Sequence, residues 1–152
     1  RNIDFIFYLV GDGPFKKQYE MFIKEHALTN KIHLTGKLKT TELRNLYRQS
    51  DFLIQASLLE GYGKVPVEGY FHGVVPFLNS TPMAKEILGD GKCGYEFEAK
   101  DPIKFAEFLL EKIQEHKLLA EKIIAGRNYC KVLTLEKWSS EMLEIVEKYY
   151  EN

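Results

Sequence analysis

The chain has 152 residues, and its 21 lysines and arginines nearly balance its 22 aspartates and glutamates. This balance offers no overall attraction for nucleic acid or for an anionic membrane. Hydrophobic residues make up 45 % of the chain, as in a folded soluble domain, and no apolar run approaches the roughly 20 residues of a membrane-spanning helix. Its two cysteines provide no disulfide framework. The composition therefore predicts a soluble, cytoplasmic protein of one domain, without a transmembrane segment or a nucleic-acid partner.

The first third of the chain alternates between strand and helix patterns. A nearly continuous apolar run predicts a buried strand over Ile3–Val10, which ends at the turn Gly11–Pro14. Apolar residues at helical spacing then predict a helix from Pro14 to about Ala27. The elements predicted next are a strand over 32–36, a helix capped by Thr40 or Thr41, a strand over 51–56 and a loop over 57–63.

The same alternation continues to about residue 97 and then gives way to helices. The predicted elements are a helix from about Pro66 to His72, a strand over 74–78, a helix from the cap Thr81 to Leu88, a strand over 93–97, a helix that begins at Asp101-Pro102, and a last helix over 139–150. Strands and helices in this order indicate an α/β fold with a parallel sheet. The sequence therefore predicts such a sheet, followed by a helical segment.

The segment from Glu60 to Glu68 is the part of the sequence that indicates chemistry. Seven residues separate the two glutamates, with glycines at positions 61 and 63 and a proline at 66. The glycines and the proline predict a loop that turns into a helix N-terminus at the carboxyl edge of the sheet. Free backbone N–H groups suit such a position to phosphate, and both carboxylates can accept hydrogen bonds from hydroxyls. A structural role stays open, in which Glu68 complements the helix dipole and Glu60-Gly61 forms a solvated turn.

Several motifs together resemble one enzyme family. Ser57, Glu60 and Glu68, with Gly73 and Pro76 after them, are similar to the pattern of the donor-binding domain of retaining glycosyltransferases of family 4. Further matching motifs are the turn Gly11–Pro14, Gly36, Leu46-Tyr47 before Ser50-Asp51, and Glu86-Ile87 before Asp90-Gly91. They occur in the family's order over about residues 5–140. The resemblance implies a single, partial nucleotide-sugar-binding domain over residues 1–152, the C-terminal half of a GT-B fold, with a Rossmann-like sheet covered by helices on both faces.

The resemblance also implies roles for individual residues. Glu60 is expected to be catalytic, because it would hydrogen-bond the donor sugar and stabilise the charge that develops as the glycosidic bond breaks. Glu68 is expected to accept hydrogen bonds from the ribose hydroxyls. Main chain at 61–65 would hold the sugar and phosphates, and main chain at 36–38 would meet the nucleobase. The implied substrate-binding residues are Gly36, Lys37, Leu38, Gly61, Tyr62, Gly63, Lys64, Val65 and Glu68. Such enzymes need no metal, so no cofactor is expected besides the nucleoside-diphosphate sugar that is the substrate.

The sequence departs from the family pattern in three respects. Lys64 stands where many members carry an apolar residue, and Gly69-Tyr70 follows Glu68 where Ala-Met is common. The strand, glycine-containing loop and helix that open the family's C-terminal domain, with the Arg and Lys that hold the diphosphate, have no counterpart, and neither has the N-terminal acceptor domain. We therefore expect a fragment that is inactive alone, with a gap or rearrangement in its sheet and an exposed edge that favours self-association.

Three function hypotheses follow. The first is the nucleotide-sugar donor-binding domain of a retaining, hexosyltransferase-type glycosyltransferase that transfers a sugar to a glycan or lipid-linked acceptor in polysaccharide biosynthesis. This enzyme would work in the cytoplasm or at the inner face of the membrane. The alternative is a non-catalytic nucleotide-sugar-binding module or partner subunit. A GT-B epimerase is a weaker third hypothesis, since it reuses the architecture without this glutamate pair in the same context.

Other features favour ordinary structural roles. The four histidines lack the spacing of metal ligands, so no metal site is expected, and Cys93 and Cys130 are expected to be packing residues. Alternating lysines and glutamates from Lys104 to Glu151 predict a solvated helical face. A stripe of apolar residues from Trp138 to Tyr149 either packs on its own domain or is an interface vacated by the acceptor domain.

Overall fold

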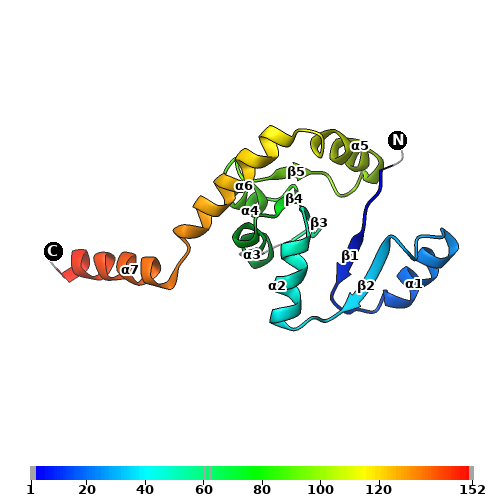
Figure 1. The fold of residues 1–152 in the computed structure, drawn as a ribbon. Coiled ribbons are helices and arrows are strands. Elements are labelled where there is room, and N and C mark those ends of the chain that lie inside the picture. Colours follow the sequence, from blue (N-terminus) through cyan, green and yellow to red (C-terminus); the bar gives the residue numbers. More distant parts are fainter. Residues whose placement is uncertain (1–2, 60, 62, 151–152) are drawn as a thin grey trace. The chain divides into compact units, whose positions relative to one another are not determined.

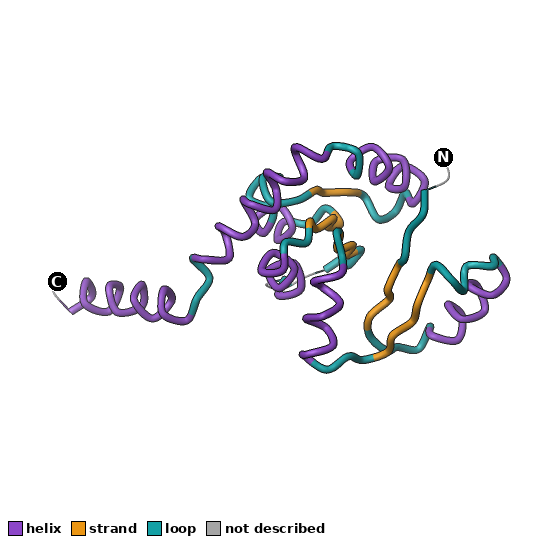
Figure 2. Tube along the Cα trace, viewed as in Figure 1, coloured by secondary structure: helices purple, strands orange, loops and turns teal. Residues whose placement is uncertain are grey.

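The structure is a computed structural model that describes residues 3–59, 61 and 63–150 (Figure 1). It divides the chain into two compact units, residues 1–46 and residues 47–152. Strands and helices alternate as far as the last strand, and only helices follow it (Figure 2). This is the predicted α/β fold with parallel strands, ending in a helical segment.

The first unit contains two parallel strands and the helix between them. Strand β1 (Phe7–Val10) pairs with β2 (Ile32–Gly36), and α1 (Lys16–Glu25) connects them. The prediction of a strand from Ile3 was too long, because regular pairing begins only where Phe7 meets the first residue of β2. The prediction of a helix start at Pro14 was also wrong, since a turn closed by the Lys16 N–H and the Gly13 carbonyl (3.2 Å) precedes α1.

Helix α2 (Thr40–Gln49) contains the boundary between the units. Thr40 and Thr41 both lie inside it, so the prediction that one of them is its cap was wrong. The carboxylate of Glu42 instead accepts a hydrogen bond from the Lys39 N–H at 2.7 Å, which satisfies a backbone donor at the start of the helix.

The second unit is a parallel sheet with the strand order β3-β4-β5 and the helices that accompany it. Its elements are β3 (Phe52–Gln55), α3 (Lys64–His72), β4 (Val75–Asn79), α4 (Pro82–Ile87), β5 (Tyr95–Phe97), α5 (Pro102–Lys112), α6 (His116–Lys131) and α7 (Leu135–Tyr150). The predicted cap Thr81 is confirmed, because its side chain accepts a hydrogen bond from the Ala84 N–H. Asp101, where the sequence predicted that the next helix begins, caps α5 by accepting a hydrogen bond from the Lys104 N–H.

Several boundaries in this unit differ from the prediction. Helix α3 starts at Lys64, so Pro66 lies in its first turn, where a proline costs no helical hydrogen bond. Strand β5 starts at Tyr95 instead of Cys93, since its pairing with β4 begins there. Helix α7 starts at Leu135 instead of Ser139, because the Thr134 hydroxyl accepts a hydrogen bond from the Lys137 N–H (3.2 Å) and acts as its cap.

Two clusters of buried side chains form the core of the second unit. One is centred on Tyr70 and includes Cys93 and Cys130, which are both buried, as the prediction of packing cysteines requires. The other is centred on Phe77, which is fully buried on β4. Because residues on successive positions of β4 are all buried, both faces of this central strand are covered.

Each sheet has two edge strands that are paired on one side only within the described residues. In this part of the chain β1 and β2 pair only with each other, and β3 and β5 pair only with β4. The backbone groups on the outer sides of these four strands are therefore left available to another strand.

Candidate functional site

The loop after β3 and the start of α3 form the candidate site of the second unit. Because β3 ends at Gln55, this loop leaves the carboxyl edge of the sheet, and α3 begins there at Lys64. A hollow lies between the loop, the end of β4 and α4. It is lined by Gln55, Ser57, Gly63, Pro66, Leu78, Asn79, Thr81, Ala84 and Ile87. The carboxyl edge of a parallel sheet is where ligands of such folds bind.

Gly63 fixes the way in which the chain enters α3. It is the N-cap of the helix and has a left-handed conformation, with φ of 64°. A Cβ on this residue would collide with the side chain of Ile87 on α4. A residue without a side chain is therefore required both by the backbone conformation and by the close approach of α4.

The first turn of α3 presents backbone donors that no described side chain caps. Gly63 at the N-cap provides no side-chain hydrogen bond, Lys64 and Val65 are exposed, and Pro66 is buried. The N–H groups at the start of a helix, together with the helix dipole, attract an anion. This turn thus has the geometry expected for the predicted phosphate-binding residues 63–65.

Glu68 lies one turn further along α3 and is held by Tyr47 of α2. The Tyr47 hydroxyl lies 3.5 Å from Glu68 Oε2 and 3.4 Å from the carbonyl oxygen of Val65, within reach of donating to either. Burial, and then the charge of Glu68, raises the pKa of Tyr47 to about 12, so the phenol keeps its proton at neutral pH. The carboxylate itself is exposed and can accept further hydrogen bonds.

Lys64 and Val65 therefore lie at the start of α3, and Glu68 lies one turn later on the same helix. Sequence reasoning did not foresee that Tyr47 contacts Glu68. The motif Leu46-Tyr47 belongs to the family pattern, but the sequence assigned no site role to this tyrosine.

Glu60 and Tyr62, the expected catalytic residue and one of the expected binding residues, lie outside the described residues. Gly61 between them is exposed, with no atom within 4 Å of the position that a Cβ would take.

The predicted base-binding residues 36–38 belong to the first unit. Gly36 is the last residue of β2 and has φ of 67°, and its carbonyl accepts a hydrogen bond from the Gly11 N–H at 2.8 Å. Lys37 is exposed and Leu38 is half-buried. Both follow the carboxyl end of β2, which is the corresponding edge of the smaller sheet.

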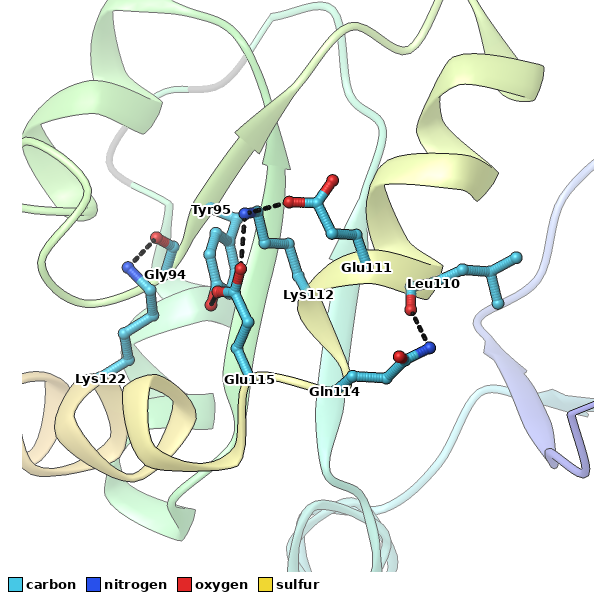
Figure 3. Close-up of polar contacts among 8 residues, drawn as sticks. All are labelled: Gly94, Tyr95, Leu110, Glu111, Lys112, Gln114, Glu115 and Lys122. Atoms are coloured by element: carbon cyan, nitrogen blue, oxygen red, sulfur yellow. Dashed lines mark hydrogen bonds and ion pairs between the residues drawn. The ribbon is translucent and has the colours of Figure 1, made fainter.

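The amino edge of the larger sheet carries a different kind of polar cluster (Figure 3). Lys122 of α6 is buried, so the prediction of a solvated lysine-glutamate face was wrong at this residue. Its ammonium donates to the carbonyl oxygens of Gly91 and Gly94 and lies 4.3 Å from the ring centroid of Tyr95. Burial lowers the pKa of Lys122.

Glu115 connects this cluster to the end of α5. It accepts hydrogen bonds from the Tyr95 hydroxyl at 3.3 Å and from the Lys112 ammonium at 2.8 Å, and Lys112 also contacts Glu111. Burial, followed by the charge of Glu115, raises the pKa of Tyr95 to about 12. Because every partner in the cluster is another group of the chain, the contacts indicate a structural role.

No group of three or more His, Cys, Asp and Glu side chains that could hold a metal ion occurs among the described residues. Within the same residues, no helix is both long and apolar enough to cross a membrane.

Comparison with known proteins identifies the family. The family model of "Glycosyl transferases group 1" matches residues 1–129. An uncharacterized glycosyltransferase of Methanocaldococcus jannaschii is 30 % identical over 148 residues, which are 97 % of this chain and 42 % of that protein. The chain thus spans less than half the length of this relative.

Solved structures agree with this assignment. The C-terminal domain of a group 1 glycosyl transferase, LpcC from Francisella tularensis, is 27 % identical, with a TM-score of 0.66 over 81 % of this chain and 63 % of the other. HepE of Anabaena in complex with UDP-glucose has a TM-score of 0.76 at 20 % identity, over 90 % of this chain and 40 % of the other. The fold is therefore the C-terminal, Rossmann-like half of a GT-B protein. The chain belongs to the group 1 glycosyl transferases.

Proposed function

We propose that this chain is the nucleotide-sugar donor-binding domain of a retaining glycosyltransferase, and that it works as part of a longer protein. The observation that carries the proposal is the first turn of α3, where uncapped backbone amides lie one turn from a carboxylate held by a tyrosine. Amides suit the diphosphate and a carboxylate suits the ribose diol. Membership in the group 1 family and the fold shared with a protein bound to UDP-glucose support the same assignment.

In this proposal each group of expected binding residues has a separate task. Amides of residues 61–65 hold the phosphates, Glu68 binds the ribose hydroxyls and the main chain at 36–38 meets the base. Glu60 contacts the transferred sugar and stabilises the positive charge that develops at its anomeric carbon. The donor diphosphate leaves with the nucleotide, and its oxygens can help to accept the acceptor proton, so no side-chain base is required. No metal takes part, and transfer is expected to persist in EDTA.

The unpaired strand edges also fit a partial domain. We propose that a further strand, outside these 152 residues, pairs with one of these edges in the longer protein, and that the apolar stripe on α7 contacts its acceptor domain. Trp138 and Tyr149 on this helix are exposed by 61 % and 78 %. Without such partners the isolated chain should self-associate through its edges, and a clean monomer in light scattering would contradict this part. The longer protein would act in the cytoplasm, on a glycan or a lipid-linked acceptor.

Titration with UDP, UDP-glucose and GDP tests donor binding in the full-length protein. Glu68→Ala should weaken nucleotide binding, because the ribose hydroxyls lose an ionised acceptor; one such hydrogen bond contributes about 1.5–3 kcal/mol. Tyr47→Phe should also weaken nucleotide binding, but by less, since the carboxylate remains and only its orientation is lost. Glu107→Ala, at an exposed position of α5, is the matched control.

The outcomes separate the two function hypotheses. Unchanged affinity in Glu68→Ala would remove the ribose role, and no binding of any nucleotide by the unmodified protein would refute the donor site. A protein that binds the donor but transfers no sugar to any acceptor would support the non-catalytic module. Transfer with inverted configuration at the anomeric carbon, measured by NMR of the product, would refute the retaining mechanism.

A further inference from the structure

Asn79, the last residue of β4, joins the ends of all three strands of the larger sheet. Its side chain is buried, with 7 % of the residue exposed. Its Nδ2 donates to the carbonyl oxygen of Ser57 at 3.0 Å, and its Oδ1 accepts from the N–H of Ala99 at 2.9 Å. Both lengths are those of well-formed hydrogen bonds. Both ends of the amide are therefore used, and each end binds backbone.

The two backbone partners belong to different loops at the carboxyl edge. Ser57 lies in the loop that follows β3, and Ala99 follows β5. Because β4 lies between these strands in the sheet, Asn79 is placed to reach both. Ser57, Asn79 and Gly63 also line the same hollow beside the start of α3. The amide thus lies next to the candidate site without being one of its predicted binding groups.

Asparagine fits this position for a specific reason. A buried backbone carbonyl needs a donor and a buried N–H needs an acceptor, and the amide supplies one of each in a single plane. An aspartate could keep the bond to Ala99 but has no N–H for Ser57. An apolar residue could satisfy neither group. The side chain therefore fixes the path of the chain as it leaves β3.

We infer that Asn79 is a positioning residue for the proposed donor site. By holding Ser57 it fixes one end of the loop whose other end is Gly63, the N-cap of α3. With Ser57 held, this end of the loop is in place before the donor arrives, which reduces the ordering cost of binding. The inference rests on the proposed function, because it concerns how the same site is held ready for a nucleotide sugar.

Hydrogen exchange and UDP titration of three variants of the full-length protein test the inference. In Asn79→Asp, amide exchange should rise in residues 56–59, while the Ala99 N–H stays protected. In Asn79→Ala, exchange should rise at both places. The dissociation constant of UDP should rise about tenfold in both variants, as expected for the loss of one positioning hydrogen bond. Tyr95→Phe is the control, because it removes a hydrogen bond from the neighbouring strand at the opposite edge.

Each result has one consequence. Unchanged exchange in residues 56–59 of both Asn79 variants would contradict the inference that Asn79 holds the loop. Unchanged UDP affinity would contradict the role of Asn79 in donor binding. An equal loss of affinity in Tyr95→Phe would show that reduced stability alone explains the effect, and would also overturn the inference. Failure of the unmodified protein to bind UDP or GDP would instead refute the proposed function itself.

Discussion

The two edges of the β3-β4-β5 sheet use polar groups in opposite ways. At the amino edge, Lys122, Glu115 and Lys112 form a dense cluster in which charged side chains bind other groups of the chain. At the carboxyl edge, the donors at the start of α3 are backbone amides without a side-chain cap among the described residues, and the exposed carboxylate of Glu68 lies beside the Tyr47 hydroxyl. In the described part of the chain, the charged groups of the amino edge are paired with one another, and the amides of the carboxyl edge carry no side-chain cap.

This difference shows that shifted pKa values do not by themselves locate a binding site. Tyr95 and Lys122 both have shifted pKa values, and both belong to the cluster that serves stability. The proposed partners of the diphosphate at the binding edge are instead backbone amides, which do not titrate. A donor with a charged diphosphate can be met there by a helix N-terminus, so a strongly basic sequence is not needed.

The comparison is tested most severely by removing the expected catalytic carboxylate. Glu60→Ala should lower transfer by the full-length protein roughly 100-fold or more, by analogy with the loss of one group that stabilises transition-state charge. The melting temperature should not change, because the carboxylate's task concerns the transition state. Transfer rates with saturating donor measure the effect, and Glu107→Ala controls for the loss of a glutamate. A rate near that of the unmodified protein would remove the catalytic assignment.

Lys122→Met should lower the stability of the protein and leave donor binding unchanged, whereas Glu60→Ala should lower transfer and leave stability unchanged. The variant leaves the carbonyls of Gly91 and Gly94 without their charged donor, and the free energy of unfolding should fall by roughly 3 kcal/mol. Donor affinity should stay unchanged, since the cluster lies at the amino edge. Urea unfolding measures the stability, and Lys117→Met at an exposed position of the same helix is the control. Loss of UDP binding in the still-folded variant would contradict the separation of the two edges.

The same cluster predicts a pH dependence of stability. The hydrogen bond from Lys112 lowers the pKa of Glu115 below its ordinary value of 4.5. A carboxylate with a lowered pKa stabilises the folded state fully above 4.5, and this contribution is lost as the pH falls through the folded-state pKa. Glu115→Gln should therefore be less stable than the unmodified protein at pH 7, and the difference should shrink below pH 4.5. A pH-independent difference in urea unfolding would contradict the ionic role.

The smallest effect concerns two glycines. At Gly69 in α3 a Cβ would lie 3.6 Å from the side chains of Leu53 and Val74, which is ordinary contact, so Gly69→Ala should stabilise the protein by about 1 kcal/mol. At Gly94 a Cβ would lie 2.5 Å from the carbonyl oxygen of Pro76, so Gly94→Ala should destabilise it. Thermal unfolding of the two variants compares them directly, and a destabilised Gly69→Ala would show that α3 cannot accept the methyl group.

Sequence patterns predicted the order of elements because each is locally determined. The apolar run before Gly11, and the caps Thr81 and Asp101, need no knowledge of neighbouring strands. Strand ends were less predictable, because pairing determines them. Strand β1 begins at Phe7 only because β2 begins at Ile32.

The sequence predicted the backbone part of the site but not the side-chain contacts that support it. Gly63 and Glu68 could be found from their spacing, since the glycines and the proline between the two glutamates indicate where the loop turns into a helix. The contact of Tyr47 with Glu68 and the two bonds of Asn79 join residues that are 20 or more positions apart. Lys122 was expected to be solvated, because a single buried lysine among exposed ones leaves no periodic pattern.

Mapping the amides that respond to UDP in the isotope-labelled full-length protein tests the central claim most directly. If the donor binds at the carboxyl edge, the N–H signals of Gly61, Gly63, Lys64 and Val65 should shift in proportion to saturation. Those of Gly91, Gly94 and Tyr95 at the amino edge should stay in place. Shifts confined to the amino edge, or saturable binding that leaves residues 61–65 unaffected, would contradict the account.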